Sequence, residues 1–330
     1  MQKRKEVVDM KSNIKTLLKI GAGVTAGVFA AGEAVYECAL NTKAAAVTAK
    51  VVPLDDERAM EIYLHHPVFA EARKWIRELH LTDTALTDEN GKEVHGYILE
   101  NPVKSNKWVI SVHGYRAIPE DMAPYAKHFY EEGYNVLLPC MCGFGHDTSK
   151  YCSMGYREKD IVKTWAEWIA GTYPDSEIIL HGVSMGSSTV VLTTGEMLPE
   201  NVKCAVADCG YTSCWDAYAS VMKSMHIPTF PILNAVDAIS KLRGNVDFKK
   251  CSAVDAAAKS VTPTLFIHGT GDTTVPFEMM DVMFNACTAE KEKLAVPDAL
   301  HAASVAADNK LYWDTVEKFI AKYTEQAAAD

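Results

Sequence analysis

Long apolar runs, clustered basic residues and a cysteine framework are all scarce in this sequence, and each scarcity excludes a class of protein. The chain has 330 residues and a formal net charge of −10, with no basic stripe after residue 20. This charge argues against nucleic acid as a partner, because phosphate binding requires a basic surface. The hydrophobic share of 48% and the charged share of 23% are those of a globular protein with a large core.

The nine cysteines are odd in number and follow no regular spacing, so a disulfide framework is not expected and a reducing compartment fits best. Cys140, Cys142, His146 and Cys152 lie close together in "CMCGFGHDTSKYC", and thiolates with an imidazole can hold zinc. Their spacing matches no zinc motif, which favours buried or loop thiols. No metal or other cofactor is therefore expected.

The N-terminus carries basic residues followed by the apolar run "IGAGVTAGVFAAG", the order found in signal and anchor segments. The run ends at Gly32 and is followed by Glu33 and Glu37, so it is shorter than the roughly 20 apolar residues of a spanning helix. A helix that lies on a membrane or packs on the protein's own body is at least as good an interpretation. Residues 1–45 are interpreted as an extension outside the main fold, and the protein as cytoplasmic or membrane-associated.

The pattern of the remaining chain predicts alternating strands and helices. Residues 55–80 have helical spacing, and "TALTDENGKEVHGYILE" predicts a hairpin around Asn90 and Gly91. Short apolar strands are then expected at 107–113, 134–139, 178–180, 203–208, 264–268 and 293–296, with helices between them. This alternation predicts an α/β fold whose central sheet is mostly parallel and flanked by helices on both faces.

One segment, at about residues 211–260, breaks this rhythm because it contains helical runs separated by Pro228 and Pro231 and no convincing strand. An insertion of this length at the carboxyl edge of a sheet is expected to cover a binding site as a lid.

The stretch "HGVSMGSS" places Ser184 between Gly182 and Gly186, where a strand turns directly into a helix. A sharp turn of this kind exposes a nucleophile, and the glycines remove side chains that would collide. The alternative is that Ser184 only caps the helix that begins at Met185.

A serine hydroxyl needs a histidine to accept its proton and a carboxylate to orient that histidine. Asp272 follows the strand in "TLFIHGTG" and His301 follows the strand in "KLAVPDAL", in the order serine, acid, histidine. Taken singly, Asp272 is also a good turn residue and His301 a good surface histidine. The competing acids are Asp298, which is too near His301 in sequence, and Asp208, which we expect to close its strand.

An oxyanion formed at this serine would require two backbone N–H donors. The amide of Met185, directly after Ser184, is one candidate, and that of Tyr115, in "HGYRA", is the other. His113 and Gly114 are expected to shape this loop.

The motifs "HGYRAIPEDM", "GVSMG", "HGTGDTTVPFEM" and "ALHAAS" together resemble the α/β-hydrolase superfamily, specifically its bacterial esterase-like and serine-aminopeptidase-like members with a helical cap. The resemblance covers residues 84–325 and implies a hydrolase domain at 46–330, with the lid at 211–260 and an N-terminal membrane anchor. Two positions depart from it. Cys140 and Cys142 replace an Asp and an Arg that brace a loop in such proteins, and Leu300 replaces a Gly before the histidine.

The expected function is hydrolysis of carboxylic esters by Ser184, His301 and Asp272 through an acyl-enzyme. Trp215, Met222 and Phe230 are candidates for an apolar substrate pocket in the lid, although lid packing also explains each of them. A peptidase or amidase would use the same three residues on a short peptide. A non-catalytic binding or membrane-tethered interaction protein is the third alternative.

Overall fold

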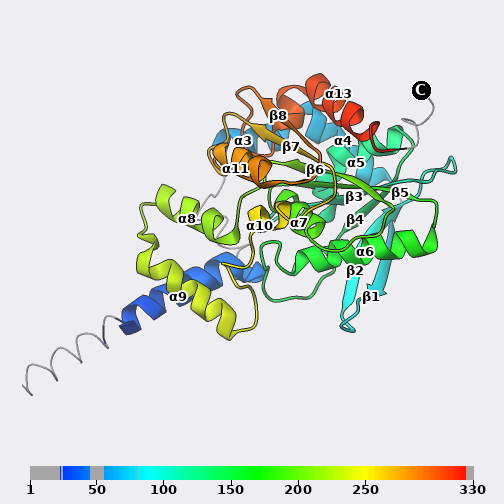
Figure 1. Cartoon of the computed structure of the whole chain (residues 1–330). Coiled ribbons are helices and arrows are strands. Elements are labelled where there is room, and N and C mark those ends of the chain that lie inside the picture. Colours follow the sequence, from blue (N-terminus) through cyan, green and yellow to red (C-terminus); the bar gives the residue numbers. More distant parts are fainter. Residues whose placement is uncertain (1–22, 24, 45–55, 80, 325–330) are drawn as a thin grey trace, which may run out of the picture.

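A computed structural model describes residues 23, 25–44, 56–79 and 81–324 (Figure 1). Its centre is one eight-stranded sheet in the order β1-β2-β4-β3-β5-β6-β7-β8. The pairs β1–β2 and β2–β4 are antiparallel, whereas every other pair is parallel. The strands are β1 (Thr82–Thr87), β2 (Glu93–Leu99), β3 (Lys107–Val112), β4 (Asn135–Pro139), β5 (Glu177–Val183), β6 (Val202–Asp208), β7 (Thr264–Gly269) and β8 (Lys291–Val296). The predicted fold class is confirmed.

Helices cover both faces of the sheet, each over its own hydrophobic core. One face is covered by α3 (Glu57–His65), α4 (Pro67–Glu78), η1 (Pro119–Met122), α5 (Ala123–Glu131), α12 (Ser304–Ala307) and α13 (Asn309–Ile320). The other is covered by α6 (Glu158–Thr172), α7 (Met185–Thr194), α10 (Ala253–Ala257) and α11 (Glu278–Ala286).

Neighbouring strand residues belong to different cores. In β3, Val109 packs with the core under α4, α5 and α13, and Ile110 packs with the core under α6 and α7. Because side chains alternate along a strand, a strand buried on both faces reads as a continuous apolar run, which is how β3 to β7 were recognisable. The parallel pairing therefore brings the carboxyl ends of six strands, β3 to β8, to one edge of the sheet.

The segment predicted as a lid contains α8 (Cys214–Ser224) and α9 (Thr229–Leu242), which stand off the sheet in Figure 1, and α10, which returns to pack against α7. Ser213 caps α8 by accepting a hydrogen bond from the amide of Asp216. Within residues 211–260, α8 and α9 are the helices that stand off the sheet (Figure 1), and they are referred to below as the cap.

The chain is also helical over residues 25–40, and this helix lies beside α9 (Figure 1). Gly32, Tyr36 and Leu40 recur every fourth residue and are buried, so they form one apolar stripe of the helix. Tyr36 and Leu40 belong to the main core, and a side chain at Gly32 would collide with Ala235 of α9.

Ion pairs hold the same helix on its polar side, where Arg243, just after α9, binds Glu33 and Glu37. Residues 25–44 therefore belong to the body of the protein, which corrects the interpretation of residues 1–45 as a separate extension. The two glutamates interrupt the apolar run because they face this arginine. The basic residues of the expected anchor, 3–19, lie outside the described residues. Among the helices that are described, none combines the length and apolarity needed to cross a bilayer.

Candidate active site

Ser184 occupies a tight turn between β5 and α7, with φ 57° and ψ −119°. The turn fits only because both flanking glycines lack side chains. A Cβ on Gly182 would lie 2.3 Å from the carbonyl oxygen of Gly186, and one on Gly186 would lie 2.0 Å from that of Val112. The Ser184 side chain makes no capping bond to α7, which disfavours the helix-cap interpretation.

The structure brings Ser184, His301 and Asp272 together from three separate strand ends. Ser184 Oγ lies 2.8 Å from His301 Nε2, and His301 Nδ1 lies 2.7 Å from Asp272 Oδ2. Because the carboxylate can only accept, His301 Nδ1–H donates to it, which leaves Nε2 to accept from the serine hydroxyl. This arrangement can pass a proton from Ser184 to His301.

Four donors fix the Asp272 carboxylate. Oδ2 accepts from His301 and from His268 Nε2 at 3.1 Å, and Oδ1 accepts from the amides of Thr274 and Val275, both at 2.9 Å. Burial alone would raise the pKa of Asp272, but the charge of His301 and these hydrogen bonds hold it well below its usual range. Asp272 is therefore an anion over the whole physiological range.

The imidazole of His301 is buried against Asp272 and Cys209. Burial disfavours the imidazolium, but the Cys209 sulfur and the Asp272 carboxylate against the ring raise the pKa of His301 above its ordinary value. Leu300, the departure before His301, is buried and leaves the imidazole within hydrogen-bond reach of Ser184. The departure therefore does not displace the histidine.

The competing acids are placed differently. Asp298 is exposed. Asp208 closes β6 as predicted and is buried, where it accepts a hydrogen bond from Ser304 Oγ at 3.0 Å. Burial raises the pKa of Asp208 to about 7, so this carboxyl is partly protonated at neutral pH.

Two side chains at this site, His268 and Cys209, were not singled out from the sequence. His268 stands four residues before Asp272 in "HGTGD". This spacing is the sequence feature that could have indicated that His268 contacts Asp272. Cys209 follows β6 with φ 50° and reaches His301 only through the packing of β6 against β7, which no sequence spacing reveals.

The backbone at Gly114 and Tyr115 lies next to Ser184. A Cβ on Gly114 would be 3.4 Å from the Cβ of Ser184. The Met185 amide belongs to the first turn of α7, where N–H groups have no acceptor within the helix. Tyr115 and Met185 line the same cavity as Ser184, and their amides stay the predicted oxyanion donors.

His113 supports this loop as a neutral imidazole. Its Nδ1–H donates to the Gly114 carbonyl at 2.9 Å, while its Nε2 accepts from the Met141 amide at 3.3 Å. Burial lowers the pKa of His113 to about 4. Its role is the one expected, namely to shape the loop.

The loop after β4 retains polar bracing despite the two cysteines. Asp147 accepts from the amides of Gly143 and Ser149 at 2.7 and 2.8 Å and binds Lys92 at 3.0 Å. Cys140 and Cys142 are buried, and burial raises the pKa of Cys140 to about 11. The cluster of Cys140, Cys142, His146 and Cys152 does not converge as a ligand set among the described residues.

A cavity of about 570 Å³ opens at Ser184 and His301 between the sheet edge and the cap. Its lining is mostly apolar and includes seven of the 13 methionines: Met60, Met122, Met154, Met185, Met222, Met225 and Met279. Of the pocket residues predicted from sequence, only Met222 lines it. Trp215 is partly buried against the core, and Phe230 is 77% exposed.

The helix over residues 25–40 closes one side of the cavity with Val35, Cys38 and Ala39. The hydroxyl of Tyr115 donates to the Ala39 carbonyl, so the chain at one predicted oxyanion donor is tied to this helix. No motif or spacing along the chain indicates this contact.

The parallel sheet, the strand–serine–helix turn and the placement of the acid and the histidine define an α/β hydrolase. A model of the prolyl oligopeptidase family matches residues 126–327, more than half of the chain. The chain belongs to the prolyl oligopeptidase family.

Two relatives match over most of their length. The uncharacterized protein YqkD of Bacillus subtilis is 26% identical over 258 residues, which cover 77% of this chain and 83% of YqkD. The uncharacterized protein YfhR of Salmonella typhimurium is 24% identical over 242 residues, which cover 71% of this chain and 79% of YfhR.

Solved structures share the fold. The Pyrococcus furiosus esterase Pf2001 superposes with a TM-score of 0.60 at 23% identity, over 74% of this chain and 93% of that one. The Pyrococcus horikoshii acylaminoacyl peptidase superposes with a TM-score of 0.55 at 16% identity, over 76% of this chain and 44% of that one. At such identities the likeness establishes the fold alone.

Proposed function

We propose that this protein is a serine esterase that cleaves carboxylic esters carrying a long apolar acyl or alcohol group. The observation that carries the proposal is the chain of hydrogen bonds from Ser184 through His301 to Asp272, of which Ser184 and His301 line an apolar cavity.

In the proposed reaction, Ser184 Oγ attacks the ester carbonyl while His301 Nε2 accepts its proton. Asp272 holds the imidazole in the required tautomer and stabilises the imidazolium. The amides of Met185 and Tyr115 donate to the oxyanion. His301 returns the proton to the leaving alcohol, and a water molecule activated by the same histidine then releases the acid from Ser184.

The lining of the cavity supports the substrate class. Methionine side chains are flexible and polarizable, so they adapt to apolar groups of different shape. Among the cavity-lining residues that the structure describes, Asp121 is the only carboxylate. Its oxygens already accept from the Tyr63 hydroxyl and from the Ile118 amide, the latter at 2.8 Å.

Peptide hydrolysis is the second candidate, and family membership favours it: the family is named for an oligopeptidase, and a structural neighbour is an acylaminoacyl peptidase. A peptidase that trims amino termini requires an acidic group for the substrate ammonium. Because Asp121 already accepts hydrogen bonds from Tyr63 and Ile118, it is poorly suited to bind a substrate ammonium. This argues against an aminopeptidase and favours an esterase.

The test is labelling by a fluorophosphonate probe, followed by turnover of p-nitrophenyl esters and aminoacyl anilides. We expect the wild type to be labelled, Ser184→Ala to be unlabelled, and octanoyl esters to be cleaved faster than any anilide. Ser224→Ala, which removes an exposed hydroxyl of α8, serves as the control. Labelling of Ser184→Ala would overturn the mechanism. Faster cleavage of anilides than of esters would show that the protein is a peptidase rather than an esterase.

A further inference from the structure

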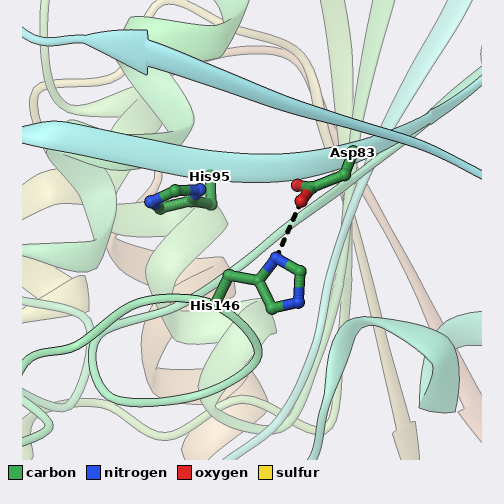
Figure 2. Close-up of side chains that lie close together, drawn as sticks. All are labelled: Asp83, His95 and His146. Carbon is green, nitrogen blue, oxygen red and sulfur yellow. Dashed lines mark hydrogen bonds and ion pairs between the residues drawn. The ribbon is translucent and has the colours of Figure 1, made fainter.

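Three side chains that commonly bind metals converge on the β1–β2 hairpin, outside the cavity. They are Asp83 of β1, His95 of β2 and His146 of the loop after β4 (Figure 2). One ligand atom from each residue lies within 4.8 Å of the others. The proposed hydrolysis uses none of the three.

The hairpin register explains the meeting of the two strand residues. Asp83 pairs with Tyr97, and Ala85 pairs with His95. Residues two apart on a strand share a face, so Asp83 and His95 are diagonal neighbours on the same face. Ala85 beside them is exposed and small, which leaves that face open to solvent.

The β4 loop brings the third side chain over this face. The His146 ring meets the Tyr97 ring edge-on at 5.5 Å, and its Nε2 lies 3.2 Å from the Tyr97 hydroxyl. Its Nδ1 points at Asp83 Oδ2 from 2.9 Å, as the dashed line in Figure 2 shows.

We propose that Asp83, His95 and His146 bind a divalent transition-metal ion, with zinc as the best match. Two imidazoles and one carboxylate suit zinc, copper or nickel, whereas magnesium and calcium prefer oxygen ligands alone. Half of the Asp83 and His146 side-chain surface is exposed, which leaves water access to the remaining coordination positions.

The geometry and the surrounding groups agree with this assignment. Ligand atoms around tetrahedral zinc are about 3.4 Å apart, given bond lengths of about 2.0 to 2.1 Å. The Asp83–His146 pair, at 2.9 Å, would have to open slightly, and the His95 ligand atom is within 4.8 Å of both. Outer partners that orient metal-binding histidines are also in place: Tyr97 at His146 Nε2, and Glu93 at His95 Nε2, 3.2 Å away.

Among the described residues, one other surface set offers comparable ligands, His128 with Glu132 and Glu317. It has a single imidazole, and that ring is stacked flat on Trp313 at 3.6 Å. A metal ion bound there would have to disrupt this stacking or replace the interaction between His128 and Glu317. The set therefore serves as a matched control.

Metal binding would also connect to the loop that borders Ser184. Phe144, two residues before His146, contacts the rings of His113 and Tyr115 edge-on at 5.8 and 6.2 Å. An ion that joins His146 to the hairpin restrains the loop that carries Phe144. Zinc is therefore expected to slow hydrogen exchange in residues 140–149.

The test is calorimetric titration of chelator-treated full-length protein with zinc chloride. We expect one saturable site in the wild type, and an affinity about tenfold weaker or more in His146→Ala and in Asp83→Asn. His128→Ala should bind as the wild type does. His146 is half exposed, so its removal does not threaten folding, and circular dichroism checks each variant.

Two results would overturn the proposal. The first is the absence of saturable binding to the folded wild type. The second is binding that His146→Ala and Asp83→Asn leave unchanged, which would place the ion elsewhere. Cobalt supplies an independent readout, since visible absorption bands of the bound ion should appear in the wild type and in His128→Ala and be lost in His146→Ala.

Discussion

The sheet edge that carries Ser184 and the cap that faces it are held in place by different interactions. At the sheet edge, Ser184 donates its amide to the Asp208 carbonyl, and Asp272 accepts from two amides and two histidines. The residues of α7 are buried along its whole length. Position at this edge is therefore set by backbone geometry and close packing.

The cap side depends on side chains at the surface. Arg243 binds Glu33 and Glu37 and lies over the rings of Tyr36 and Tyr151 at 4.7 and 5.7 Å, which joins α9 to the N-terminal helix. Phe230 and Leu242 of α9 remain 77% and 84% exposed. We call the Ser184 side the reacting edge and the cap side the substrate wall. The reacting edge is held by buried backbone contacts, and the substrate wall by side chains at the surface.

The largest expected effect is on the reacting edge. His301→Ala removes the proton acceptor, and we expect a loss of about 10⁴-fold in kcat for p-nitrophenyl octanoate. Thermal unfolding should stay close to the wild type, because the smaller side chain leaves the backbone bonds of this edge intact. Retention of more than a tenth of wild-type kcat would mean that another group accepts the proton.

Asp272→Asn should lower kcat by about 10²- to 10⁴-fold and change the pH profile. His301 must be neutral to accept a proton, so activity rises as pH rises through the pKa of His301. The carboxylate raises that pKa, so the acid limb of kcat/KM in the wild type should lie above the ordinary imidazole value of about 6.5. In Asp272→Asn the limb should move to lower pH. An unmoved limb would show that Asp272 does not set the His301 pKa.

A smaller effect is expected from narrowing the cavity on its cap side. Met222→Trp fills part of the cavity, and we expect kcat/KM for octanoyl esters to fall by about tenfold or more while acetyl esters are affected much less. Met197→Trp is the control, since Met197 is 89% exposed. Equal losses for both esters would indicate damage to the reacting edge instead.

The smallest effect is expected at Arg243, whose ion pairs join α9 to the N-terminal helix. Arg243→Ala removes two half-exposed ion pairs and their ring contacts, and we expect the free energy of unfolding to fall by about 1 kcal/mol. Octanoyl-ester KM should rise with kcat nearly unchanged. Lys310→Ala, which breaks the exposed pair with Asp314, controls for loss of a surface charge. If kcat fell as strongly as in His301→Ala, the two regions would not be separable.

The reacting edge was largely predictable because each of its residues follows a recognisable strand. Ser184, Asp272 and His301 stand directly after apolar runs, and parallel strands bring such positions to one edge. Cys209 was missed because its contact with His301 depends on tertiary packing. His268 was missed although it contacts Asp272 only four residues further along the chain, because that spacing alone does not single out a histidine. Trp215 and Phe230 were misplaced, since residue type predicts that a side chain is apolar and not which way a cap helix turns it.

Three features can be read from the sequence alone: the order of strands and helices, the glycine-flanked turn at Ser184, and the chain order of the serine, the acid and the histidine. These features are local, because periodicity, turn chemistry and strand ends are fixed by neighbours along the chain. The folded structure is needed to show that residues 25–40 close the cavity, that methionines from distant segments line it, and that Asp83, His95 and His146 meet. Those contacts join residues far apart in sequence, so they arise only when the elements pack.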